Sequence, residues 1–349
     1  MNNKSALLLA FLLLLPITFS NSHAKEPTPL ESTRTVGRSE SKTLTEPSFN
    51  GKKVLTINSY HKGYTWSDGI EAGILKIFKK FPEIECKFYR LDSKRNTSES
   101  YLREAALNAK KLIETWKPDV VIASDDNASK YVIVPYYKNV ELPIVFCGVN
   151  WNVAPYGYPY KNVTGMIEVA LMDDLVRTLR TYSKGNRIGF LGPAVTSARQ
   201  DASYYKGIMG IEFTQETYVK TFDEWKSAYL QMQQKVDILI VPALEGTKNW
   251  DPKEASDFIQ AHTEIPSGAE VELMAKYVLA TFAKDPAEQG EWAATTALEI
   301  LKGKKPEDIP IVTNRKAKII LNMKLAKKLD IKFPMELLER ATFVGEEAY

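Results

Sequence analysis

Short apolar runs alternate with amphipathic stretches along most of the chain. Between residues 51 and 150, runs of strand length are separated by segments in which apolar side chains repeat at helical spacing. Such a pattern is typical of a parallel sheet with helices on both faces. We therefore predict a doubly wound α/β sheet in this region. The predicted strands are 53–58, 85–91, 119–124 and 143–148, and the predicted helices are 68–81, 101–116 and 127–137.

The same alternation starts again near residue 168. It predicts helices at 172–183, 197–210, 222–234 and 251–262, and strands at 187–192, 212–219 and 236–243. Because a single hydrophobic core stops growing near this chain length, we expect two lobes, each with its own sheet. Further on, the pattern predicts helices at 269–282, 287–303 and 323–331, a strand at 317–322 and a tail at 334–344. These segments can complete either lobe, so we expect the chain to cross between the lobes more than once.

The first 50 residues do not follow this alternation. Lys4, the apolar run 6–19 and the small residues Ser22 and Ala24 have the arrangement of a secretory signal peptide, which predicts cleavage after Ala24. The alternative, an uncleaved membrane anchor, needs a longer apolar run. Residues 25–50 are polar without apolar periodicity, and we expect them to form a flexible leader. The remaining chain is expected to be a soluble protein exported to the periplasm.

Charge and motifs exclude several function classes. The formal net charge is +3, or +2 without Lys4, and the charges are interspersed, which argues against a nucleic-acid partner. The chain has no GxSxG, GxGxxG or GxxxxGK[ST] motif, and its three histidines are His23, His61 and His262. We therefore predict neither an enzyme nor a metal or cofactor site, although two carboxylates of a glycosidase could be placed anywhere in such a chain.

The chain has two cysteines, Cys86 and Cys147. They lie on different predicted strands. An exported protein can form a disulfide, but we expect these two thiols to stay unpaired.

The segments that follow the predicted strands are rich in aromatic, amide, carboxylate and hydroxyl side chains. In an open α/β sheet, ligands bind outside the carboxyl ends of the strands. We therefore predict that these segments meet in one ligand site. The candidate ligand-binding residues are Ser59, Tyr60, His61, Tyr64, Trp66, Asp125, Asp126, Asn127, Asn150, Trp151, Thr196, Ser197, Glu245 and Trp250.

Each type of residue has a chemical role available in such a site. The aromatic rings are suited to stacking on a ring or enclosing a cation. Asp125 and Asp126 can receive an ammonium group or sugar hydroxyls, and Thr196 and Ser197 are predicted to cap a helix whose first turn favours an anion. Glu245 and Trp250 reach the site only if the second lobe closes over the first.

The alternative for most of these residues is a structural role. An aromatic side chain at a strand end can simply pack over a helix, and one of the two aspartates can cap the helix predicted near Asn127. His61 fits a hydrogen-bonding loop residue better than a base or metal ligand. The convergence of five loops, more than any single residue, supports a ligand site.

Several stretches resemble a known family. The segments "INSYHKGYTWSDGIEAGI", "VVIASDDNA" and "PIVFCGVN", together with residues 265–311 and 322–341, are similar to the ABC transporter substrate-binding protein family that includes tryptophan- and tyrosine-binding members. The resemblance runs from about Lys53 to the C-terminus, and related domains also occur in sensing proteins. It implies a periplasmic binding protein type I fold, with two Rossmann-like lobes of parallel sheet joined by a hinge that the chain crosses several times.

The resemblance also implies the lobe boundaries. Lobe 1 would contain residues 51–167 and 265–310, and lobe 2 would contain residues 168–264 and 311–349. The implied strand order is flavodoxin-like, which places the strands of Cys86 and Cys147 on opposite sides of the first lobe.

The sequence departs from the family in two places. Members that bind aromatic amino acids carry a second-lobe turn with Ser, Glu and Asn; here the matching stretch is "AVTSARQ", in which Ser197 corresponds but Arg199 stands where a Glu would follow. The loop after the first strand is also more aromatic than in typical transport members. Both differences resemble the sensor-associated branch.

These patterns together predict a monomeric periplasmic solute-binding protein that captures a small organic ligand between two closing lobes for an ABC transporter. The ligand is expected to be aromatic or amino-acid-like, although sugars use the same residue types. The alternative is a ligand-sensing component that feeds a membrane histidine kinase or similar signalling protein. The expected partners are therefore a small molecule and either an ABC permease or a membrane sensor.

Overall fold

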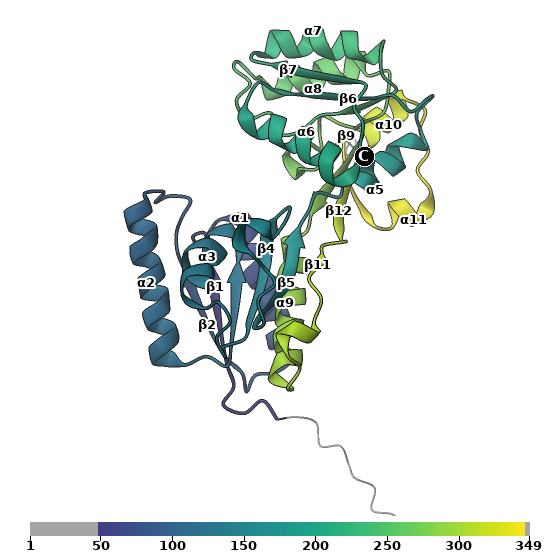
Figure 1. Cartoon of the computed structure of the whole chain (residues 1–349). Coiled ribbons are helices and arrows are strands. Elements are labelled where there is room, and N and C mark those ends of the chain that lie inside the picture. Colours follow the sequence, from purple (N-terminus) through teal and green to yellow (C-terminus); the bar gives the residue numbers. More distant parts are fainter. Residues whose placement is uncertain (1–47, 346–349) are drawn as a thin grey trace, which may run out of the picture. The chain divides into compact units, whose positions relative to one another are not determined.

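The computed structural model describes residues 48–345, which form two α/β sheets with helices packed on them (Figure 1). The predicted signal peptide and nearly all of the predicted leader lie outside the described residues. Within residues 48–345, no helix has the length and apolar character needed to cross a bilayer.

The first sheet has six parallel strands in the order β11-β5-β4-β3-β1-β2. Their bounds are β1 Lys53–Asn58, β2 Glu85–Arg90, β3 Val120–Ser124, β4 Ile144–Asn150, β5 Val163–Glu168 and β11 Val312–Thr313. The order of β1 to β5 is the flavodoxin-like one that the family resemblance implies. The strand β5 was not predicted, because Thr164 and Gly165 interrupt its apolar run.

Helices pack on this sheet because their apolar positions share one face. Their bounds are α1 Thr65–Phe78, α2 Glu99–Trp116, α3 Asp125–Ala128, α4 Val134–Tyr136 and α9 Pro286–Leu301, with a π-helical turn at Ser129–Ile133. In α2, for example, Leu102, Ala105 and Ala109 are buried, and the Ser98 hydroxyl caps the first turn by accepting from the Tyr101 N–H.

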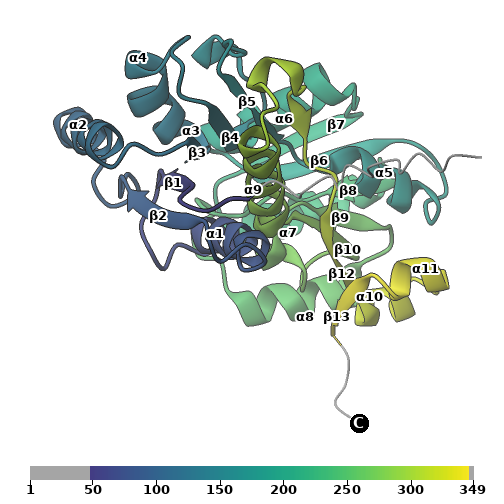
Figure 2. The same cartoon turned by 90° about the horizontal axis from the view of Figure 1, so that it is seen from below.

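The helices α1 and α9 lie side by side on the first sheet (Figure 2). Glycines at their contact make the close approach possible. A Cβ placed on Gly290 would lie 2.0 Å from the Ile70 carbonyl oxygen, and one on Gly73 would lie 2.4 Å from that of Ala287. Two helix backbones that are far apart in the sequence are thereby brought into direct contact, at a place where only glycine fits.

The second sheet has seven strands in the order β13-β12-β10-β9-β8-β6-β7, and only β10 and β12 are antiparallel among these pairs. The strands are β6 Ile188–Pro193, β7 Gln215–Val219, β8 Ile238–Ile240, β9 Ser267–Ala269, β10 Ala280–Lys284, β12 Ala317–Asn322 and β13 Ala341–Val344. The helices are α5 Met172–Arg180, α6 Thr196–Met209, α7 Phe222–Gln233, α8 Pro252–His262, α10 Met323–Lys328 and α11 Met335–Leu338.

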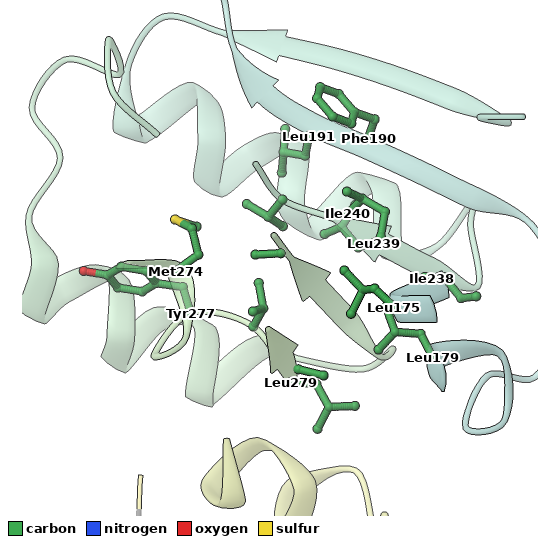
Figure 3. Packing of buried hydrophobic residues seen from close by; sticks show 14 of the residues in the cluster. Leu175, Leu179, Phe190, Leu191, Ile238, Leu239, Ile240, Met274, Tyr277 and Leu279 are labelled. Atoms are coloured by element: carbon green, nitrogen blue, oxygen red, sulfur yellow. The ribbon is translucent and has the colours of Figure 1, made fainter. Parts of the chain in front are cut away.

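The core of the second sheet is formed by aliphatic side chains of its strands and of α5. Figure 3 shows Leu175 and Leu179 of α5 beside Ile238 and Leu239 of β8. All four of these side chains are almost completely buried. Each sheet therefore has a hydrophobic core of its own, as the pattern of the sequence predicted.

The predicted helix at 269–282 is wrong. Residues of this stretch instead form the end of β9, a 3₁₀ turn at Glu272–Met274 and the strand β10. Because β10 is buried along nearly its whole length, its sequence lacks the alternation that distinguishes a half-buried strand, and a short apolar run does not separate strand from helix.

The chain passes between the two sheets three times. The first passage lies between the end of β5 at Glu168 and the start of α5 at Met172. The second follows β10 at Lys284 and not Ile265, because β9 and β10 belong to the second sheet. The third follows β11 and so comes after Thr313 and not at Pro310. The three connecting segments, residues 169–171, 285 and 314–316, are called the crossing segments below.

Hydrogen bonds tie the crossing segments together. The buried Asn314 side chain accepts from the Val169 N–H at 2.7 Å and donates to the Val169 carbonyl at 3.1 Å. The Glu288 carboxylate accepts from the N–H groups of Arg315 and Lys316 at 2.9 and 2.7 Å. The first and third crossing segments are thus each held by a side chain from another part of the chain.

Cys86 and Cys147 are both free thiols, as the sequence predicted. Cys86 lies on β2 at the sheet edge, and Cys147 lies on β4, with β1 and β3 between them. Burial raises the pKa of the Cys86 thiol to about 11.

Candidate functional site

Ser59, directly after β1, holds the ends of two neighbouring strands in place. Its hydroxyl donates to the Ser124 carbonyl at 2.7 Å and accepts from the Ala128 N–H at 2.8 Å. The Ser93 hydroxyl donates to the Ser59 carbonyl and in turn accepts from the Asn127 side chain. Ser59 is fully buried. Its polar contacts, like the one recorded for Asn127, therefore serve to position the loops around the candidate site.

Trp66 and Asp125, which lie far apart in the sequence, are joined by a hydrogen bond. The helix α1 begins at Thr65, three residues earlier than predicted, so Trp66 lies in its first turn. The Trp66 indole Nε1 donates to Asp125 Oδ1 at 2.8 Å, and the Ser124 hydroxyl donates to Oδ2 at 3.0 Å. Asp125 therefore holds the Trp66 ring at the end of β3.

The carboxylate of Asp125 is almost entirely buried, with 1% exposure. Burial, and then the nearby Glu168, raise its pKa well above the usual value. The backbone of Asp125 has a φ of +67°, and Gly148 leaves the space it needs, since a Cβ there would lie 2.8 Å from Asp125 Oδ1. A positive φ is uncommon for a residue other than glycine, although aspartate tolerates it better than most.

Neither aspartate caps a helix, so that expectation is wrong. The N-cap position of α3 is Ser124, and Asp125 and Asp126 are the first two helical residues. Asp126 instead accepts hydrogen bonds from Asn150 Nδ2 and from the Tyr156 hydroxyl, each at 2.6 Å. Unlike Asp125, Asp126 is partly exposed.

Trp151 follows β4 with a φ of +62°, a strained backbone conformation for a large aromatic residue. Its ring lies 4.8 Å from that of Tyr204 and 5.8 Å from that of Tyr205, both on α6. Trp151 therefore connects the end of a first-sheet strand to a helix of the second sheet.

A cavity of about 330 Å³ lies at this contact. Its lining comes from the ends of β3 and β4 and from α6, and contains acids, amides and aromatic rings. The lining residues are Asp126, Asn150, Trp151, Asn152, Pro155, Ser197, Gln200, Asp201 and Tyr204. The structure thus brings four of the predicted site residues, Asp126, Asn150, Trp151 and Ser197, into one cavity.

A buried ion pair lies at the crossing segments near these residues. Lys284 Nζ, at the end of β10, is 2.6 Å from Glu168 Oε1, at the end of β5. Burial alone would lower the pKa of Lys284, but Glu168 and Glu270 outweigh it and raise this pKa to about 12. Lys284 Nζ also lies 5.9 Å from the Trp66 ring centroid.

Several carboxylates lie around the single ammonium group of Lys284. Burial raises the pKa of Glu168, and Lys284 opposes this effect. Burial, with Glu270, raises the pKa of Asp201 to about 6. The Tyr60 pKa is also raised by burial and by the charges of Asp125, Asp126 and Glu168. The electrostatic field around the cavity is therefore negative.

The loop after β1 forms a small aromatic group. The rings of Tyr60 and Tyr64 are 5.0 Å apart, edge to face, and Lys94 Nζ lies 4.6 Å from the Tyr60 ring centroid. His61 Nδ1 lies 3.6 Å from Asp92 Oδ1, which fits the role of a loop residue.

The remaining candidates lie in helices and loops around the second sheet. Thr196 is the first residue of α6, and its N-cap is Val195, without a side-chain cap bond, so the predicted capping by Thr196 and Ser197 is wrong. Trp250 packs on Phe222, Trp225 and Tyr277 in the second hydrophobic core.

Glu245 and Trp250 are not among the residues that line the cavity, and the side chain of Glu245 is exposed. The guanidinium of Arg199 lies 4.0 Å from the Tyr218 ring centroid, over β7.

Sequence reasoning missed several residues around the cavity. They are Tyr156, Glu168, Asp201, Tyr204, Glu270 and Lys284. Glu168 and Lys284 end the strands β5 and β10, which were not predicted as strands. The strand-end rule would have found both if those strands had been recognised. In the part of the chain that the structure describes, no group of three or more His, Cys, Asp or Glu side chains is placed to hold a metal ion.

Comparison with known families agrees with this architecture. The family described as ABC transporter substrate binding protein matches residues 68–344. The chain belongs to this family. Members of this substrate-binding protein family bind a solute and belong to ABC transport systems, and the class is not an enzymatic one.

Solved structures of substrate-binding proteins share the fold. One is the ligand-free, open form of a substrate binding protein with adhesive properties from Clostridium difficile, with 18% identity and a TM-score of 0.62 over 85% of this chain and 100% of that one. Another is an ABC transporter solute binding protein from a Bradyrhizobium species with bound bis-tris, with 15% identity and a TM-score of 0.54 over 82% and 88%.

The fold of this substrate-binding protein is accordingly that of type I periplasmic binding proteins, with two Rossmann-like lobes joined by several crossings. No curated protein matches its sequence.

Proposed function

We propose that this chain captures an aromatic or amino-acid-like small molecule in the cavity beside Trp151 and delivers it to an ABC permease. The observation that carries this proposal is the convergence of segments from both sheets. Asp126 and Trp151 follow strands of the first sheet, whereas Ser197 and Tyr204 lie on α6 of the second, and all four line one cavity. A site built from two lobes is what a protein needs if it holds its ligand by closing.

The rings of Trp151 and Tyr204 supply flat apolar faces for a ligand ring. The carboxylate of Asp126 offers a charged acceptor, and its hydrogen bonds from Asn150 and Tyr156 hold it in one orientation. A cavity of about 330 Å³ is at the small end of the range for ligand sites. These features support a ligand of the size of an amino acid or a small aromatic amine.

The crossing segments supply the hinge in this proposal. The side chains of Asn314 and Glu288 hold two of those segments by hydrogen bonds to backbone groups. Movement at these segments leaves the two hydrophobic cores intact. A closed form expels water from the cavity and strengthens the polar contacts within it. We further propose that residues 1–24 export the chain to the periplasm, where the closed form meets the permease.

Mass spectrometry of small molecules released from natively purified protein tests this function. The compound found should bind the wild type in calorimetry, and Trp151→Ala and Asp126→Asn should each weaken its binding by about tenfold or more. Asp223→Asn is the control, since the Asp223 side chain on α7 is 89% exposed and does not line the cavity, and it should leave the affinity unchanged. Wild-type affinity in both cavity variants would place the ligand elsewhere.

A further inference from the structure

The cavity beside Trp151 is lined by carboxylates without a basic partner. Asp126 and Asp201 are its charged residues, and none of the described residues that line it is a lysine, arginine or histidine. A ligand carboxylate or phosphate in this cavity would therefore meet two negative charges and no lining cation. A ligand cation would gain from both.

The buried lysine near the cavity, Lys284, already forms an ion pair. Lys284 is paired with Glu168 at 2.6 Å, and Glu270 and Asp201 add further negative charge around its ammonium. Three carboxylates, those of Glu168, Glu270 and Asp201, therefore surround this one ammonium group before a ligand is counted. Freeing Lys284 to bind an anion would leave the buried Glu168 without its partner, which is costly.

The other two features that could attract an anion are also unfavourable. The guanidinium of Arg199 stacks on Tyr218, which is not a lining residue. The first turn of α6 has backbone N–H groups near Ser197, but Asp201 lies four residues later on the same face and lines the same cavity. An anion at Ser197 would thus lie next to a carboxylate.

A further buried carboxylate, that of Glu270, adds negative charge near the cavity without lining it. Glu270 is about nine-tenths buried, with 9% exposure, and its Oε2 has no hydrogen-bond partner among the described residues. Its charge acts on Asp201, a cavity residue, and on Lys284. The aromatic faces of Trp151 and Tyr204 complete the surroundings that favour a cation.

We propose that the ligand is an organic cation, an amine joined to a ring or alkyl group and without a carboxylate or phosphate. This inference rests on the proposed function and narrows its ligand class. The amine lies between Asp126 and Asp201, and the apolar part of the ligand packs on Trp151 and Tyr204.

Three indole compounds of nearly equal size test the charge preference: tryptamine, L-tryptophan and indole-3-propionate. They share the indole ring and a two-carbon link from the ring to the charged group or groups, but are a cation, a zwitterion and an anion. Calorimetry on the full-length exported protein should show tryptamine binding at least about tenfold more tightly than either carboxylate-bearing compound. Asp201→Asn should weaken tryptamine by about tenfold and leave indole-3-propionate unchanged or tighter. The control Asp223→Asn, at an exposed site on α7, should change neither.

The outcomes separate this inference from the proposed function. If L-tryptophan or indole-3-propionate binds most tightly and Trp151→Ala weakens that binding, the ligand is not a simple cation, although the cavity is still the ligand site. If none of the three compounds binds, the cation inference is overturned, while the compound released from native protein decides the proposed function by itself. If a compound binds without any effect of Trp151→Ala or Tyr204→Ala, both proposals fail.

Discussion

Lys284 Nζ lies 2.6 Å from Glu168 Oε1, and this ion pair joins the end of β10 in the second sheet to the end of β5 in the first. Both residues stand where the chain passes from one sheet to the other. The pair thereby links two crossing segments and neutralises one carboxylate of a group that includes Asp201 and Glu270.

Replacing Lys284 by methionine should lower the free energy of unfolding by about 4 kcal/mol near neutral pH, because Glu168 would be buried without a cation. Burial raises the pKa of Glu168, so the folded protein protonates this carboxyl more readily than the unfolded chain does. The stability that protonation provides is fully present below the unfolded pKa and is lost as pH rises through the folded one. Urea unfolding should therefore show a smaller loss at about pH 5 than at about pH 8. Lys253→Met is the control, because that side chain is 88% exposed. A loss that does not depend on pH would contradict this role.

Replacing Asp125 by asparagine should flatten the pH dependence of stability. The folded pKa of Asp125 lies well above its unfolded value, so its contribution is complete below about pH 4 and is lost as pH rises through the folded pKa. Asparagine cannot ionise, keeps an acceptor for Trp66 Nε1 and tolerates the positive φ. The variant should therefore lose less stability than the wild type between about pH 5 and pH 8 in urea unfolding. Identical pH profiles for the two proteins would show that Asp125 does not titrate as its burial requires.

Gly290→Ala should destabilise the protein by about 3 kcal/mol, because the new methyl group would meet the Ile70 carbonyl at 2.0 Å and push α1 away from α9. Gly207→Ala is a matched control in the helix α6, where a Cβ meets nothing within 4 Å. There the same change should stabilise the protein by about 0.5 kcal/mol, because alanine is the better helix former. Chemical unfolding of both variants measures the contrast. Equal effects would show that the close contact of α1 and α9 is absent in solution.

The fold was predictable from sequence wherever apolar periodicity is unambiguous. Apart from β5, strands and helices up to residue 262 appear close to their predicted positions, since most are either short apolar runs between polar segments or stretches with helical spacing. The strand β5 was missed because Thr164 and Gly165 interrupt its apolar run, and β10 was missed because it forms part of the longer apolar stretch 269–282 that was predicted as a helix. The site residues were predicted only where the strand before them was predicted. Asp126 and Trp151 follow predicted strands, whereas Glu168 and Lys284 follow the two strands that were missed.

Tryptamine binding should tighten as pH rises from about 5 to about 8, because deprotonation of Asp201 favours a bound cation. Its pKa is raised to about 6 by burial and by Glu270 after β9, and lowered by Lys284 of β10. Asp126 of α3 lines the same cavity from the first sheet and strengthens the effect. In Asp201→Asn, calorimetry should show a clearly flatter affinity over this range. Weaker binding at higher pH in the wild type would contradict the expected charge of the ligand.

Hydrogen–deuterium exchange with and without the compound released from native protein tests the central claim most directly, because it needs no substitution. If Asp126, Trp151 and Tyr204 share one ligand, exchange should slow together in three separate segments, residues 124–128, 149–156 and 196–204. The groove lined by Tyr182, Lys184 and Arg187, distant from these segments in the fold, should exchange as before. Protection confined to that groove, or to one segment alone, would contradict the account.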